Sequence, residues 1–246
     1  MKKNLALQLY SVRKELQRDY RATFKRVAEL GFTGVEFAGF YNIDARAMRE
    51  ALDAYGLQAV GSHTPSAQVE NNMDEVIAYN RAIGNRVIGL NFPDLRDEEG
   101  LAAARKIIRA SLPQVEAAGM EFCYHNHCHE FSKINGRYVL DLLYQEFSPE
   151  ELRPELDTYW VYRAAEDPVT YCSQYKGRCK LIHLKDGTRE GFAPVGCGEI
   201  DIAQVLDMAM DMDVDWVILE DESVEPKGLR AVEIGVQNLR NTYHFL

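Results

Sequence analysis

The sequence predicts an α/β fold, a single (β/α)8 TIM barrel over residues 1–246, and three observations lead to it. Short apolar or β-branched runs alternate with longer amphipathic segments from one end of the chain to the other. A glycine, the residue at which helices commonly end, stands just before several of these runs, as at Gly31, Gly56 and Gly119. The junctions recur about every 25 to 36 residues, the size of one strand and one helix with their loops.

Eight segments are expected to be strands, because each is a short apolar or β-branched run. They are residues 4–10, 33–38, 57–63, 86–91, 120–127, 154–159, 179–185 and 214–220. Helical periodicity predicts helices at 20–30, 44–54, 71–83, 97–118, 137–147, 167–175, 201–212 and 227–243. No linker or low-complexity tract interrupts the alternation, and eight such units in roughly 250 residues are typical of a closed barrel. An open doubly wound sheet is the alternative, but its first strand is normally followed by a Gly-rich turn, and residues 11–14 contain no glycine.

The composition is that of an ordinary globular protein, with 46% hydrophobic and 27% charged residues. The net charge of −10 opposes binding to a phosphate backbone, so no nucleic-acid partner is expected. No apolar run approaches the roughly 18 to 20 residues of a membrane span, and the start of the chain lacks the pattern of a signal peptide. The five scattered cysteines form no Cys-x-x-Cys pair, which indicates reduced thiols. We therefore expect a cytoplasmic protein without a membrane partner; the sequence leaves its oligomeric state open, a homo-oligomer included.

A histidine cluster stands at the end of the fifth predicted strand, where His125, His127 and His129 are followed directly by Glu130. Neutral imidazole is the commonest protein ligand for transition metals and the side chain that titrates nearest to neutral pH. The cluster therefore indicates a metal site or a proton-transfer site. A surface loop or a set of hydrogen-bonded core histidines is the alternative.

Six of the eight predicted strands finish on an ionisable residue flanked by apolar ones. These residues are Glu36, His63, His125 with Glu130 just beyond it, Asp157, His183 with Lys185 two residues later, and Glu220. The carboxyl ends of the strands of a (β/α)8 barrel meet at one face, where active sites are built. A charged group in an apolar run is costly unless it is paired or metal-bound. The convergence predicts one shared metal and substrate site, and the mixture of carboxylates and imidazole favours one divalent ion, Mn²⁺, Co²⁺, Mg²⁺ or Zn²⁺.

These motifs carry a family resemblance. The chain resembles the xylose isomerase-like barrel superfamily of sugar isomerases and epimerases, in the branch with Tyr-His-Asn-His-x-x-Glu-Phe at strand 5, here residues 124–131. Further matches are Leu-Asp-Thr-Tyr-Trp at 156–160, Ile-His-Leu-Lys-Asp at 182–186, Val-Gly-x-Gly at 195–198 with Ile-Asp at 200–201, and Val-Ile-Leu-Glu at 217–220. The resemblance spans nearly the whole chain in the correct order, although its motifs distinguish substrates poorly.

The resemblance implies a single divalent metal held by ligands from strands 5 to 8. Asp157, His183 and Glu220 match the last three of these positions. At the strand 5 position many members carry Glu where this sequence has His125, so either Glu130 supplies the carboxylate or His125 itself coordinates the metal. We favour Glu130, which leaves His125 and His127 free to act on the substrate.

The implied activity is that of a metal-dependent isomerase or epimerase. It would remove the proton next to the carbonyl of a small sugar or polyol ketone, with His125, Glu130 and Glu220 as candidate catalytic residues. Candidate substrate contacts are His63, His127, Lys185, Glu36 and Trp160. For Lys185 a surface salt bridge, and for Trp160 a place in the core, are the structural alternatives. If a leaving group lies β to the carbanion, the same site gives elimination, so a dehydratase or lyase acting on a keto-sugar or inosose is the close alternative.

Two remote alternatives remain. An endonuclease IV-like nuclease would share the barrel but needs extra histidine ligands, whereas Trp160 stands at one such position and no histidine lies between His183 and His244. An inactive sugar-binding barrel would predict no bound metal, although all three well-matched ligands are present. The only candidate for a phosphate cradle is Val-Gly-Cys-Gly at 195–198, so an unphosphorylated substrate is favoured.

Overall fold

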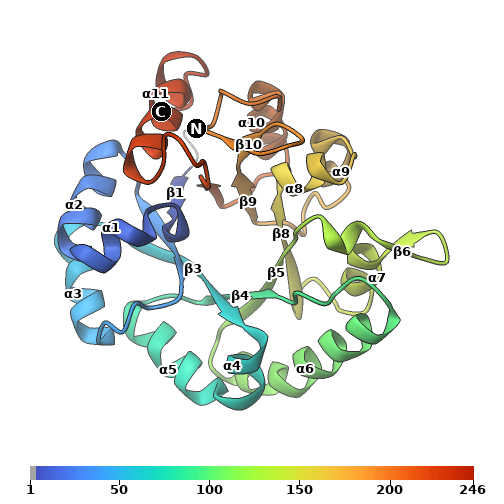
Figure 1. Cartoon of the computed structure of the whole chain (residues 1–246). Helices are drawn as coiled ribbons and strands as arrows, with labels where there is room; N and C mark the ends of the chain where they lie inside the picture. The colour runs from blue at the N-terminus through green and yellow to red at the C-terminus, as the bar shows by residue number, and fades with distance from the viewer. Residues whose placement is uncertain (1–3) are drawn as a thin grey trace.

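Eight parallel strands close into a barrel in the computed structural model, which describes residues 4–246, and helices surround this barrel (Figure 1). Around the barrel the order is β1-β12-β9-β8-β5-β4-β3-β2, so barrel strands that follow one another in the sequence pair, and the first and last, β1 and β12, close the barrel. The strands are β1 (Asn4–Gln8), β2 (Gly34–Ala38), β3 (Gln58–Pro65), β4 (Val87–Asn91), β5 (Glu121–His125), β8 (Leu152–Asp157), β9 (Leu181–Leu184) and β12 (Trp216–Leu219). The predicted fold class and all eight predicted strands are confirmed.

The outer layer contains the eight predicted helices with slightly shifted ends. They are α2 (Tyr20–Leu30), α3 (Ala45–Tyr55), α5 (Met73–Ile83), α6 (Glu98–Ala117), α7 (Val139–Gln145), α9 (Pro168–Ser173), α10 (Ile202–Asp211) and α11 (Leu229–Asn241). Helices α2 and α3 end at Gly31 and Gly56, whose φ angles of 104° and 66° lie in the left-handed region that glycine adopts without strain. The glycine signal in the sequence therefore marked real helix ends.

Several short elements were not predicted. They are the 3-10 helices η1 (Leu9–Val12) and η2 (His129–Phe131), the helices α1 (Arg13–Arg18), α4 (Ser66–Asn71) and α8 (Thr158–Arg163), and two hairpins, β6 (Lys133–Ile134) with β7 (Arg137–Tyr138) and β10 (Asp186–Gly187) with β11 (Phe192–Ala193). The helix expected at 71–83 begins at Met73, because Asn72 breaks the chain into α4 and α5. The strand expected to reach residue 159 ends at Asp157. The side chain of Asp157 caps the amino terminus of α8, which begins at the next residue.

The barrel interior changes character along its axis. Its amino-terminal end contains an apolar cluster of Ala6, Val60, Cys123, Leu181, Trp216 and Ile218. Leu181 and His183 are two residues apart in β9, so both side chains face the same side of the sheet. The polar residues of the predicted site therefore lie above an apolar floor, at the carboxyl ends of the strands.

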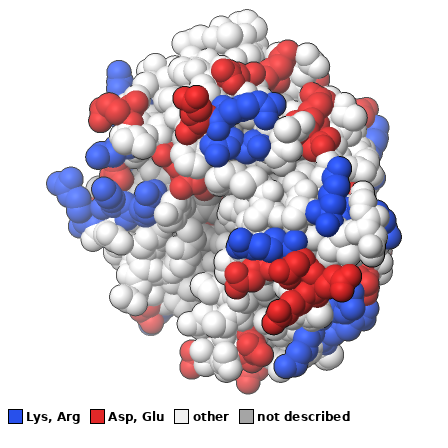
Figure 2. Space-filling model, turned by 45° about the vertical axis from the view of Figure 1, so that its right-hand side comes forward, with Lys and Arg blue, Asp and Glu red and all other residues white. Residues whose placement is uncertain are grey.

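The outer surface carries charges of both signs. On the face shown in Figure 2, Lys and Arg side chains lie beside Asp and Glu side chains. Surface ion pairs such as Arg26 with Glu233, at 2.7 Å, and Lys176 with Asp211, at 2.8 Å, are of this kind. Within residues 4–246, no helix has both the length and the apolar character needed to cross a bilayer.

Gly100, in the first turn of α6, gives a test of packing. A Cβ atom there would lie 1.9 Å from the backbone oxygen of Asp94, which cannot turn away as a flexible side chain could. We expect Gly100→Ala to lower the free energy of unfolding by about 1–3 kcal/mol, although alanine is normally the better helix former. Urea denaturation measures this, with Gly191→Ala as the control because no atom lies within 4 Å of its added Cβ. Equal stabilities of the two variants would contradict the steric argument.

Candidate active site

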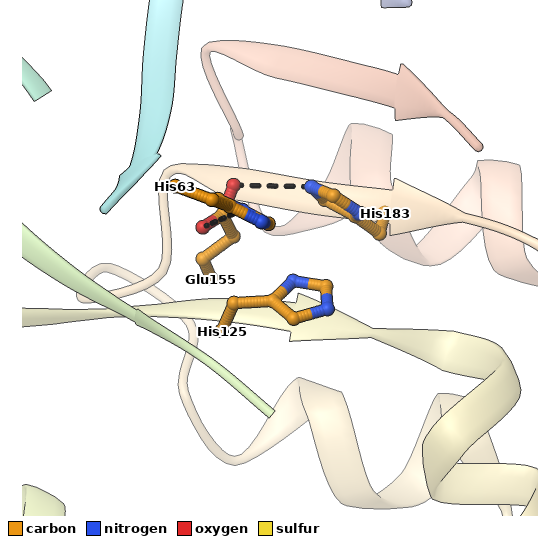
Figure 3. A group of neighbouring side chains, drawn as sticks. All are labelled: His63, His125, Glu155 and His183. Carbon is orange, nitrogen blue, oxygen red and sulfur yellow. Dashed lines mark hydrogen bonds and ion pairs between the residues drawn. The ribbon is translucent and has the colours of Figure 1, made fainter. Parts of the chain in front are cut away.

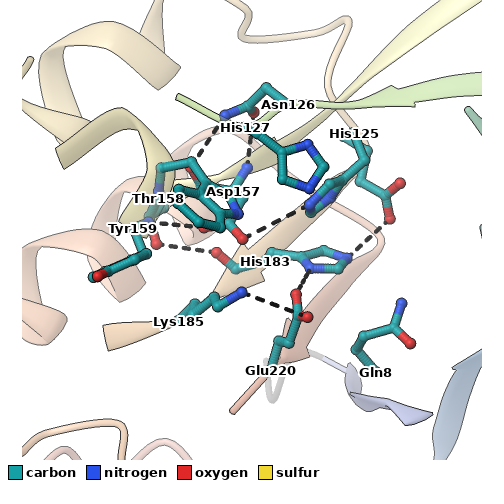
Figure 4. A network of polar contacts seen from close by, with 12 residues as sticks. Gln8, His125, Asn126, His127, Asp157, Thr158, Tyr159, His183, Lys185 and Glu220 are labelled. Atoms are coloured by element: carbon teal, nitrogen blue, oxygen red, sulfur yellow. Dashed lines mark hydrogen bonds and ion pairs between the residues drawn. The ribbon is translucent and has the colours of Figure 1, made fainter. Parts of the chain in front are cut away.

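Four side chains converge at the carboxyl ends of neighbouring strands (Figure 4). They are His125 at the end of β5, Asp157 at the end of β8, His183 in β9 and Glu220 directly after β12. One nitrogen or oxygen atom from each lies within 4.8 Å of those of the other three. His183 Nδ1 is 3.0 Å from Glu220 Oε2, and His125 Nε2 is 3.8 Å from Asp157 Oδ2. All four residues are buried.

Asp157 is held by backbone groups in a way that leaves one oxygen free. Its Oδ1 accepts the backbone N–H groups of Tyr159 at 2.9 Å and Trp160 at 3.2 Å, which caps α8. Its own backbone N–H donates to Asn126 Oδ1 at 3.0 Å, which ties the ends of β5 and β8 together. The other oxygen, Oδ2, is buried and has no hydrogen-bond partner among residues 4–246.

A buried carboxylate oxygen without a partner is costly unless a cation supplies the missing interaction. Two imidazoles and two carboxylates around one point are a donor set suited to a divalent transition metal. The residues of this group therefore fit the metal that the sequence predicts.

The charge states of the group follow from burial and from Lys185. Burial raises the pKa of Asp157 to about 6, with Lys185 opposing the shift and the Glu220 charge adding to it. For Glu220, burial works against ionisation, but the Lys185 ammonium and the hydrogen bond from His183 outweigh it and hold the pKa below its usual range. Burial and the neighbouring imidazoles, first that of His183, lower the pKa of His125 well below its usual value. His125 is thus a neutral imidazole, the form that binds metals.

Glu130 does not join this group, which corrects the sequence-based choice of the strand 5 ligand. Its Oε1 accepts the hydroxyl of Tyr124 at 2.7 Å, and its Oε2 accepts the backbone N–H of His127 at 2.8 Å. The side chain is fully buried and its metal-type neighbours are His127 and His129. Glu130 lies in the short helix η2, beyond the end of β5, and its carboxylate bonds to the backbone of the loop that precedes this helix. The residue of β5 that groups with Asp157, His183 and Glu220 is His125.

A cavity of about 440 Å³ opens beside this group, and two of the four donors, His125 and Glu220, line it. Its lining includes six residues that the sequence singled out for the site: His63, His125, His127, Trp160, Lys185 and Glu220. The volume is in the range of roughly 300–1,000 Å³ that small-molecule sites occupy. Glu36 is not part of the lining: it is fully buried and accepts a hydrogen bond from Gln8 Nε2 at 2.7 Å, so the expected direct contact between Glu36 and substrate is not supported.

Lys185 forms one wall of the cavity and is itself buried. Its ammonium lies 3.5 Å from Glu220 Oε1, pairs with Glu222, and lies 5.1 Å from the centre of the Trp160 ring. Although burial opposes it, the charge of Glu220 raises the pKa of Lys185 above its usual value, so the side chain stays protonated. The surface salt bridge considered as an alternative for Lys185 is thus wrong: the ion pairs are internal and belong to the site.

Two further residues near the site were missed, Gln8 and Glu155. Both are buried, and Glu155 contacts His63 and His183. Glu155 stands two residues before Asp157 in β8, so the two acidic side chains face the same side of the sheet. That spacing in a strand was the signal that could have identified Glu155.

The glycines of the segment 195–198 do not form an open phosphate cradle. The backbone N–H groups of Gly196 and Gly198 both donate to Asp186 Oδ2 at 2.9 Å, and that of Gly187 donates to Asp186 Oδ1 at 2.7 Å. A carboxylate of the chain therefore already occupies the donors that a phosphate would need.

The fold and the site together define a (β/α)8 barrel with a candidate divalent-metal centre beside a cavity of about 440 Å³. Residues 24–242 match the model of the family described as the xylose isomerase-like TIM barrel, and the chain belongs to this family.

Relatives with named activities are distant. Inosose dehydratase of Lacticaseibacillus casei is 23% identical over 236 residues, covering 78% of each chain. Inosose dehydratase of Clostridium botulinum is 23% identical over 270 residues, covering 89% of this chain and 87% of that one. The crystal structure of a sugar phosphate isomerase/epimerase from Parabacteroides distasonis superposes with a TM-score of 0.86 and 23% identity, covering 98% of this chain and 95% of that one. The named relatives are enzymes, and the structural likeness supports the fold.

The strand 5 assignment is testable with a pair of variants. We expect Glu130→Gln to keep the metal content of the wild type, because Glu130 is not among the four donors, while turnover falls about 10-fold as His127 loses its anchor. We expect His125→Gln to lose most of its metal. Metal analysis of the purified variants measures both. Loss of metal from Glu130→Gln with retention in His125→Gln would return the ligand role to Glu130.

Proposed function

We propose that the protein is a metal-dependent isomerase or epimerase of a small sugar or polyol ketone, which removes the proton on the carbon next to the carbonyl. The observation that carries the proposal is the convergence of His125, Asp157, His183 and Glu220, with Asp157 Oδ2 buried and without a hydrogen-bond partner among residues 4–246. Two of the four, His125 and Glu220, line the cavity. A divalent cation bound there would polarise the substrate carbonyl and offset the negative charge that develops when the proton leaves.

The side chains around this point have complementary tasks. Glu220 is ionised and lines the cavity, so we assign it the removal of the proton, at Oε1. His127 also lines the cavity, and its Nδ1 has no hydrogen-bond partner among residues 4–246. In the view of Figure 4, His127 and Glu220 lie on opposite sides of His125. We assign His127 the return of a proton, to the neighbouring carbon in an isomerisation or to the opposite face of the same carbon in an epimerisation.

Elimination is the second candidate, in which the protein is a dehydratase or lyase of a keto-sugar or inosose. It is favoured by the imidazole of His127 and the ammonium of Lys185 on one cavity, since either can protonate or neutralise a departing oxygen. Two curated relatives named inosose dehydratase point the same way at the level of the family. Proton removal by Glu220 is common to both reactions, and only the fate of the carbanion differs.

The experiment is metal analysis of the purified protein, followed by incubation with ketoses, 3-keto sugars and inososes in D₂O. We expect one divalent ion per chain and deuterium at the carbon next to the carbonyl. A rearranged sugar of unchanged mass, apart from deuterium, identifies an isomerase or epimerase, whereas loss of water or of an alcohol identifies a lyase. Less than about 0.2 metal per chain together with no deuterium in any substrate would contradict the proposal.

A further inference from the structure

A second layer of polar side chains lies beside the four donors. It consists of Gln8, Glu36, His63, Cys123 and Glu155, from five different strands. Both carboxylates are fully buried, and no cavity contact with substrate is available to them. Charged groups so deep in the barrel require a specific partner or a specific task.

Glu155 is the centre of this layer. Its Oε1 lies 3.1 Å from His183 Nε2, and its Oε2 lies 3.2 Å from His63 Nε2 (Figure 3). The thiol of Cys123 also donates to Oε2, at 3.2 Å. One carboxylate therefore contacts two imidazoles, one from the candidate metal group and one from the lining of the cavity.

The two nitrogens of His183 have different surroundings. Nδ1 faces Glu220 Oε2 at 3.0 Å, in the group of four donors. Nε2 faces the second layer, where Glu36 Oε2 at 2.7 Å and Glu155 Oε1 are both acceptors. If Nδ1 of a neutral imidazole coordinates a cation, the ring carries its proton on Nε2. The carboxylates of Glu36 and Glu155 are placed to accept a hydrogen bond from that N–H.

Hydrogen bonds join most of this layer, although Glu36 Oε1 is buried without a hydrogen-bond partner among residues 4–246. Glu36 Oε2 accepts from Gln8 Nε2 and lies 3.3 Å from His63 Nε2, so one N–H from each imidazole is sufficient to join both carboxylates. A further cation among His63, His125, Glu155 and His183 is the competing reading, because their donor atoms also lie within 4.8 Å of one another and His125 Nδ1 has no partner among residues 4–246. The existing contacts favour positioning over a second ion.

We propose that Glu155 is a positioning residue of this site, which fixes the rings of His183 and His63 through its two oxygens. It would hold Nδ1 of His183 toward the bound cation and hold His63 against the substrate. The inference rests on the proposed function for its cation, but the orientation of the two rings can be measured without any ion.

The test uses the full-length protein and Glu155→Gln, which keeps the shape of the side chain and removes its charge. We expect the dissociation constant for Mn²⁺ to rise about 10- to 100-fold, because partners behind a ligating histidine commonly contribute that much. In the metal-free protein labelled with ¹⁵N-histidine, we expect the NMR signals of both His63 and His183 to shift. Glu121→Gln is the control, since Glu121 stands at the far end of β5 and pairs with Arg153 at 2.7 Å. If Glu155→Gln fails to fold, Glu155→Asp keeps the charge and shortens its reach, with the same two readouts.

Mn²⁺ affinity of Glu155→Gln within threefold of the wild type, with the histidine signals unmoved, would overturn the inference and leave the proposed function intact. A wild type that binds two ions, one of which is lost in Glu155→Gln, would also overturn it, because the layer would then be a cation site. A wild type that binds no ion overturns the proposed function instead, and the histidine spectra alone then decide whether Glu155 orients the rings.

Discussion

Asp157→Asn is expected to lose most of its bound metal and to turn over at least about 10³-fold more slowly, since a bound cation supplies several kcal/mol of transition-state stabilisation. Asn can still cap α8, because its amide oxygen can take the place of Oδ1 toward the N–H groups of Tyr159 and Trp160. What it cannot supply is a second anionic oxygen at the position of Oδ2, the buried atom without a partner. The fold should therefore survive while the metal is lost.

Metal content and turnover of the purified variant measure this effect. Asp167→Asn is a matched control, because Asp167 caps α9 through the backbone N–H of Thr170 at 2.7 Å and is not a member of the donor group. The control should keep its metal and its activity. A fully loaded and active Asp157→Asn protein would show that the cation, if one binds, is held elsewhere.

Lys185→Met is expected to lower the free energy of unfolding of the metal-free protein by about 3–5 kcal/mol, the usual cost of removing one partner from a buried ion pair. Lys185 is 1% exposed and its ammonium faces Glu220 and Glu222, with Asp157 close enough to affect its pKa. Methionine fills similar space but leaves these carboxylates without the compensating charge. Addition of a divalent ion should recover part of the loss, because it restores positive charge beside Glu220 and binds only the folded state.

Urea denaturation with and without Mn²⁺ measures both effects. Lys176→Met is the control, since Lys176 pairs with Asp211 at an exposed position and such pairs contribute about 0–1 kcal/mol. If Lys185→Met were no more destabilised than Lys176→Met, the internal ion pairs of Lys185 would not stabilise the fold.

The barrel strands were predictable because each is a short apolar run, and because helix ends carried a glycine, as at Gly31 and Gly56. The short hairpins were not predictable, since segments such as Lys133–Ile134 are too brief to show a period. The predicted strand 154–159 includes the first two residues of α8, Thr158 and Tyr159, which are β-branched and aromatic and so favour a strand. In the structure, Asp157 caps α8 at this point and the strand ends.

For the site, a position at the end of a strand was sufficient to predict that Asp157, His183 and Glu220 lie close together, because the barrel brings these ends together. It was insufficient for Glu130, whose direction depends on the turn that follows β5 and on the hydroxyl of Tyr124. Glu155 was missed because it lies two residues before the end of β8 and not at the end itself. A sequence shows which residues share a face of a strand. It does not show which of them will instead form hydrogen bonds with neighbouring groups of the chain, as Glu130 does.

The carboxyl of Asp157 has a consequence for how such proteins diversify. It anchors α8 through the backbone N–H groups of residues 159 and 160, and every amino acid except proline provides that group. The side chain at position 160, which lines the cavity, can therefore be exchanged during evolution or in the laboratory without moving the anchor or the oxygen beside it. Mutation at position 160 can in this way change the wall of the cavity without changing the group of four donors. This holds although the same carboxyl, that of Asp157, anchors α8 and belongs to that group.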